Sequence, residues 1–64
     1  MIDTAELFAL MTCQIEDLHG IAVEGQEADL PTEVSRAFAD LLATGLQRAN
    51  AITTQIERSL GDVQ

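Results

Sequence analysis

The feature that most constrains this chain is a repeated spacing of apolar and small residues in its second half. The steps between neighbours follow the order 4, 3, 4, which is an eleven-residue repeat. A repeat of about 3.67 residues per turn keeps its members on one side of a nearly straight α-helix, whereas a strict seven-residue repeat winds a helix into a left-handed supercoil. The members are Val34, Phe38, Leu41, Gly45, Ala49, Ile52, Ile56, Leu60 and Val63. The spacing therefore predicts one long helix.

A shorter apolar row in the first half of the chain predicts a second helix. Its members, three and four residues apart as in a heptad seam, are Phe8, Met11, Ile15, Leu18 and Ala22. Asp3 or Thr4 can cap the start of this helix through a side-chain oxygen. Gly20 lies within the row, but apolar residues continue beyond it, so we expect the helix to span residues 3–24. Gly25 is then expected to end the helix in the left-handed conformation.

The connection between the two helices is predicted at residues 25–30. A link this short joins antiparallel neighbours. Pro31 suits the first turn of a helix, where its missing N–H costs nothing, so the second helix is expected over residues 31–60. The whole chain, residues 1–64, is therefore predicted to be one all-α domain, a two-helix antiparallel hairpin with arms of unequal length.

A tight turn between Glu24 and Pro31 predicts the register of the hairpin. Opposed residues then have numbers that add to about 55. Leu18 would lie over Phe38, and the Phe8 ring would face the small residues Gly45 and Ala49. Everything after Ile52 would have no partner within the chain. The residues left over form an apolar overhang, namely Ile56, Leu60 and Val63.

The overhang predicts that the hairpin pairs with another chain. An apolar surface of several turns is not left to water, and 64 residues bury too small a core for comfortable stability. Two hairpins related by a two-fold axis would close into a four-helix bundle. The alternative is a monomer that folds onto a larger protein partner. The residues expected to pack within or between hairpins are Phe8, Met11, Ile15, Leu18, Phe38, Leu41, Gly45, Ala49, Ile52, Ile56 and Leu60.

Charge and cysteine content restrict the partners and the compartment. The formal net charge is −8, with no lysine, so the chain is expected to repel nucleic-acid phosphates and anionic membranes. No apolar run approaches the roughly 18 residues that a membrane span needs. Cys13 is the only cysteine, and the chain starts with no secretion signal, which favours the reducing cytoplasm.

Two places in the sequence suggest metal binding or nucleophilic chemistry, but the surrounding residues favour neither. Glu16 and His19 have the Glu-x-x-His spacing that presents two metal ligands on one helix face, but Glu16 is expected to point outward. Cys13 has acidic neighbours, which do not activate a thiol as a nucleophile, so a small half-buried residue is expected there. Since His19 is the only histidine, no catalytic dyad is available. We predict no enzymatic activity and no cofactor.

The function predicted from the sequence is that of a small acidic protein-interaction module that acts through helix packing. One alternative is an acidic inhibitor that mimics nucleic acid and occupies a basic cleft. A carboxylate- and histidine-bound metal protein ranks below it. The expected partners are a second copy of the chain and another protein. The outline resembles two-helix adaptors such as Rop-like hairpins or small secretion chaperones, in architecture alone, and architecture does not fix function.

Overall fold

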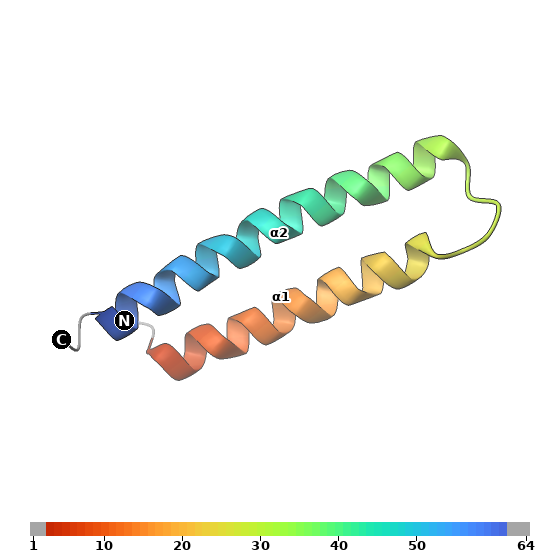
Figure 1. The fold of residues 1–64 in the computed structure, drawn as a ribbon. Coiled ribbons are helices and arrows are strands. Elements are labelled where there is room, and N and C mark those ends of the chain that lie inside the picture. The colour runs from red at the N-terminus through yellow and green to blue at the C-terminus, as the bar shows by residue number, and fades with distance from the viewer. Residues whose placement is uncertain (1–2, 62–64) are drawn as a thin grey trace.

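The chain folds into two long antiparallel helices that pack against each other. A computed structural model describes residues 3–61, with α1 at Thr4–Gly25 and α2 at Thr32–Gly61. The prediction of an all-α hairpin with unequal arms is confirmed: α1 has 22 residues and α2 has 30. The start of α1 and the end of α2 lie side by side at one end, opposite the loop (Figure 1). The Cα atoms extend over 51 × 16 × 15 Å.

The helix α1 begins at the predicted cap and passes through its internal glycine. An Asp3 carboxylate oxygen accepts a hydrogen bond from the backbone N–H of Glu6 at 2.8 Å, and the Asp3 carbonyl accepts from the N–H of Leu7 at 3.1 Å. The first bond satisfies a donor that the helix start leaves free, and the second is the first i→i−4 bond of the helix. The helix is unbroken at Gly20, as expected.

The end of α1 differs from the prediction. Gly25 is the last helical residue, but no described glycine has a positive φ. The helix instead tightens, because the backbone N–H of Gln26 donates to the Val23 carbonyl at 3.1 Å. The left-handed conformation is taken four residues later by Asp29, with φ of 67°, and a short polar side chain tolerates that conformation. Pro31 lies one residue before α2, and its carbonyl accepts from the N–H of Val34 at 3.0 Å.

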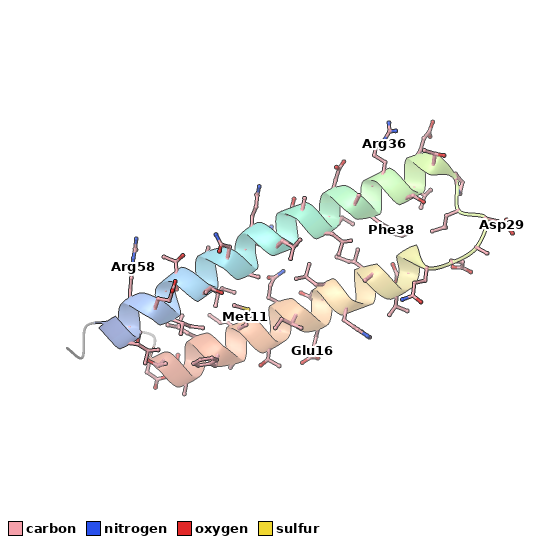
Figure 2. The ribbon with its side chains drawn as sticks, viewed as in Figure 1. Met11, Glu16, Asp29, Arg36, Phe38 and Arg58 are labelled. Atoms are coloured by element: carbon pink, nitrogen blue, oxygen red, sulfur yellow. The ribbon has the colours of Figure 1, made fainter. Side chains whose placement is uncertain are left out.

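The contact between the helices follows a heptad spacing in both. We call the buried and half-buried residues that recur at steps of three and four the seam. In α1 the seam comprises Thr4, Leu7, Met11, Gln14, Leu18 and Ile21. In α2 it comprises Phe38, Leu42, Gly45, Ala49, Ile52, Ile56 and Ser59. Met11 and Phe38 point into the space between the helices (Figure 2).

The seam corrects the predicted eleven-residue row. Three of that row's members, Val34, Leu41 and Leu60, are exposed, and Leu42 and Ser59 occupy the seam instead. A helix that packs along a single partner follows the seven-residue spacing of a seam, so the longer repeat does not describe the contact. Val63, the last member of the predicted row, lies outside the described residues.

The register of the hairpin also differs from the prediction. Leu18 lies against Gly45, Gly25 lies beside Phe38, and the Thr4 and Ser59 hydroxyls share a hydrogen bond. The residue numbers of each pair add to 63, not 55. The helices are therefore displaced by eight residues, or about 12 Å, from the predicted alignment.

This displacement removes the predicted overhang and the predicted packing of Phe8. Ile56 is 8% exposed and lies level with Leu7, which is 4% exposed, so α2 is covered within the chain as far as Ile56, whereas Leu60 stays 55% exposed. Phe8 does not face Gly45 and is 53% exposed. The predicted alignment would have set Leu18 against Phe38, two large side chains, whereas the observed one sets Leu18 on a glycine. The extra length of α2 lies at the loop end.

Candidate interaction surfaces

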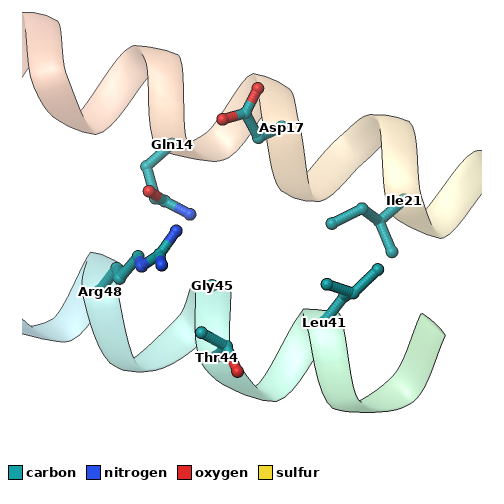
Figure 3. Close-up of a pocket in the computed structure, with 7 residues that line it drawn as sticks. All are labelled: Gln14, Asp17, Ile21, Leu41, Thr44, Gly45 and Arg48. Atoms are coloured by element: carbon teal, nitrogen blue, oxygen red, sulfur yellow. The ribbon is translucent and has the colours of Figure 1, made fainter. Parts of the chain in front are cut away.

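One side of the hairpin carries a shallow groove between the helices (Figure 3). Its volume is about 350 Å³, and Gly45, which has no side chain, forms part of its lining. The lining residues are Gln14, Asp17, Ile21, Leu41, Thr44, Gly45 and Arg48. Asp17, Leu41 and Arg48 each directly precede a seam residue. Residues at such positions in both helices therefore share this side, which we call the groove face.

The opposite side of the hairpin is apolar. Successive residues of a helix are turned by about 100°, so residues that directly follow a seam position lie on the side opposite the groove. The residues of this group that lie farther round each helix include one charged residue, Glu57. Those nearest the seam, which recur every seven residues in each helix, define the apolar face: Phe8, Ile15, Ala22, Ala39, Leu46, Thr53 and Leu60. None is charged, and the four large ones are more than half exposed, at 53%, 55%, 60% and 55%.

The two faces differ in charge as well as in hydropathy. The groove face carries Asp17 on α1 and Arg48 on α2, with the Gln14 amide beside the Arg48 guanidinium (Figure 3). Glu16 points away from α2, and Arg36 and Arg58 point away from α1 (Figure 2). Every described Asp, Glu and Arg side chain is exposed. The apolar face is therefore a charge-free band on a strongly acidic molecule.

The predicted packing residues divide between the seam and the outer surface. Seven of them lie in the seam: Met11, Leu18, Phe38, Gly45, Ala49, Ile52 and Ile56. Phe8, Ile15 and Leu60 lie on the apolar face, and Leu41 lies on the groove face. Sequence reasoning did not single out Leu46, although it follows Gly45 and is the most exposed large apolar residue described, at 60%. Its seven-residue distance from Ala39 and Thr53 is the signal that identifies it.

The weak chemical candidates are separate and exposed. Glu16 and His19 both lie on the surface of α1, and residues 3–61 contain no group of three or more His, Cys, Asp or Glu side chains placed to hold a metal ion. Cys13 is exposed, which corrects the expected half-buried position. It precedes Gln14 and is turned away from the seam.

Neither the described helices nor known proteins point to another kind of site. Between residues 3 and 61, no helix combines the length and apolar character needed to cross a membrane. A comparison with protein families, curated proteins and solved structures found no significant match. The two faces of the hairpin are therefore the candidate sites for binding a partner.

The exposed acids predict how stability depends on salt. With a net charge of −8, like charges repel in the compact state, and salt screens them over about 8 Å at physiological ionic strength. We expect the melting temperature, followed by circular dichroism, to rise with NaCl and level off by about 0.5 M. A melting temperature that falls with salt would instead mean that the acids are held in ion pairs with the arginines.

Proposed function

We propose that this chain is a non-enzymatic interaction module, which pairs with a second copy into a four-helix bundle and binds another protein on its outer surface. The observation that carries the proposal is the amount of apolar surface left open. Among residues 3–61, only Leu7 and Ile56 are buried large apolar residues, while eight large apolar side chains are exposed. Exposed apolar surface of this extent marks interaction sites.

The accessible surface area of the chain supports pairing with a second chain of the same size. The chain exposes 5057 Å², whereas a compact monomer of 6.9 kDa exposes about 4,000 Å². The difference of about 1,000 Å² is close to the roughly 800 Å² that each partner buries in a stable protein interface. One further chain of similar size would therefore cover the excess.

The exposed acids favour a protein with a basic surface as the additional partner. Glu16 points outward from α1, and the neighbouring acids are exposed as well. Electrostatic complementarity of this kind speeds association and selects partners.

The spacing of the acids makes a nucleic-acid mimic the weaker candidate. α1 is about 33 Å long, and one strand of duplex DNA places about ten phosphates over that length. The helix and its cap carry five acids, which are Asp3, Glu6, Glu16, Asp17 and Glu24. Charge at half the density of one strand is a poor imitation of a phosphate backbone.

The exposed thiol of Cys13 supports a cytoplasmic location in this proposal. A lone surface cysteine forms bonds between chains in oxidising compartments, whereas the cytoplasm keeps it reduced. The lone and exposed His19 supports a binding role over catalysis, because general base catalysis needs a base held against its reactant.

The proposal predicts the mass of the protein in solution. Light scattering coupled to size exclusion, under reducing conditions, should give twice the 6.9 kDa chain mass at micromolar concentration. Reduction ensures that Cys13 does not create the dimer. A folded monomer at this concentration would contradict the proposed pairing.

A further inference from the structure

We propose that two copies of this chain pair through the apolar face, with their loops at opposite ends of the bundle and the two-fold axis passing near Ile15 and Leu46. This inference rests on the proposed function, because it names the surface and the geometry of the pairing. It also leaves the groove face of each copy on the outside of the dimer.

Charge indicates a second copy as the occupant of the apolar face. Two chains of net charge −8 repel each other wherever their acids meet. The apolar face offers contact with few carboxylates, because none of its seven residues is charged and Glu57 is the one acid among the other described residues that follow a seam position. Most of the acids that would attract a basic partner lie outside this face.

The distribution of large and small residues indicates the orientation. In the observed register Ile15 is nearly level with Leu46, and Ala22 is nearly level with Ala39 at the loop end. Phe8 and Leu60 lie toward the open end. The face is therefore bulky at its centre and at the open end, and thin at the loop end.

When the two loops lie at opposite ends of the bundle, the bulky part of one apolar face packs against the thin part of the other. A two-fold axis across the hairpin at Ile15 sets Phe8 over the partner's Ala22, and it sets Ile15 against the partner's Ile15. With the loops together, the alanines of both copies would meet at one end and leave a gap, which close-packed interfaces avoid. At the other end of the bundle, the bulky open ends of both copies would meet.

Cross-linking distinguishes these orientations. In a Cys13→Ser background, Ile15→Cys should join to itself with a short thiol–thiol cross-linker, because the two copies of this position meet at the axis. Leu41→Cys, on the groove face, is the matched control and should give no dimer band. If Ile15→Cys fails to join to itself and instead joins Leu46→Cys in a mixed sample, the loops lie together and the proposed orientation is wrong.

Charge substitutions test the face itself. Leu46→Glu and Leu41→Glu alter leucines of similar exposure, 60% and 52%, on opposite faces of α2. Light scattering should show that Leu46→Glu abolishes the dimer at micromolar concentration while Leu41→Glu keeps it. Loss of the dimer only in Leu41→Glu would assign pairing to the groove face and overturn the inference. A dimer in both variants would overturn it too, whereas a monomeric parent chain would contradict the proposed function.

Discussion

Ile56→Asp is expected to abolish most of the helical structure at room temperature. The Ile56 side chain is 8% exposed and lies level with Leu7, the most buried large residue described. A carboxylate there has no cation within the seam, and burying an unpaired charge costs several kcal/mol. A domain of 64 residues has roughly 3–10 kcal/mol of total stability, so the loss is a large part of it. Circular dichroism at 222 nm, with urea unfolding, measures the effect.

The control for this variant lies one residue away. Gln55→Asp adds the same charge at an exposed position of α2, so its helicity should stay close to that of the parent chain. Equal stability of the two variants would mean that Ile56 is not in the seam. A folded but monomeric Ile56→Asp variant would mean that this residue lies in the contact between copies, as the sequence first predicted.

Gly45→Leu should lower the melting temperature by about 5–15 °C, because the two helices leave no room for a leucine side chain at this position. A Cβ atom added at Gly45 would come too close to the Leu18 side chain, and it would lie 3.2 Å from Gln14 Nε2. A full leucine must push the helices apart, and overpacking of this kind costs about 1–3 kcal/mol or more. Helix propensity returns at most about 1 kcal/mol, so the strain dominates. Thermal melts followed by circular dichroism give the difference.

Two alanine substitutions separate packing from helix propensity. Gly20→Ala meets nothing within 4 Å, so it should stabilise α1 by up to about 1 kcal/mol. Gly45→Ala has the same gain in propensity but must displace Leu18, and it should be the less stable of the two. A Gly45→Leu variant as stable as Gly20→Ala would show that the helices do not approach closely at this point.

The helices themselves were predictable because their signals are local. The cap at Asp3, the glycine at the end of α1 and the proline before α2 each act within one turn of the chain, so each boundary was placed within one residue. The left-handed residue was missed because Gly25 is the obvious candidate. The backbone N–H of Gln26 instead donates to the Val23 carbonyl, and the left-handed conformation occurs at Asp29.

The register was not predictable from apolar spacing because α1 has two candidate rows side by side. Phe8, Ile15 and Ala22 each follow a seam residue, and this row is as apolar as the one that faces α2. The choice of an apolar residue at each step favoured Ile15 over Gln14, yet Gln14 is the half-buried one.

The features that select the observed register give little signal in the sequence. They are a glycine that receives Leu18 and a pair of hydroxyls at Thr4 and Ser59. Both are recognised only once the helices are aligned. The apolar face was missed for the same reason, since its residues become a surface of their own only after the seam is known.

The side-by-side placement of the start of α1 and the end of α2 determines how the module would connect other molecules. Anything joined before α1 leaves the hairpin at the same point as anything joined after α2 (Figure 1). In a dimer with its loops at opposite ends and its axis at Ile15, each α1 begins 11 residues, or about 17 Å, from the axis, so these exit points lie roughly 35 Å apart. Two molecules attached at these points would be held at that separation. The separation would determine their effective concentration when both bind a pair of target sites at once. The length of the helices would therefore determine the distance between the two attached molecules.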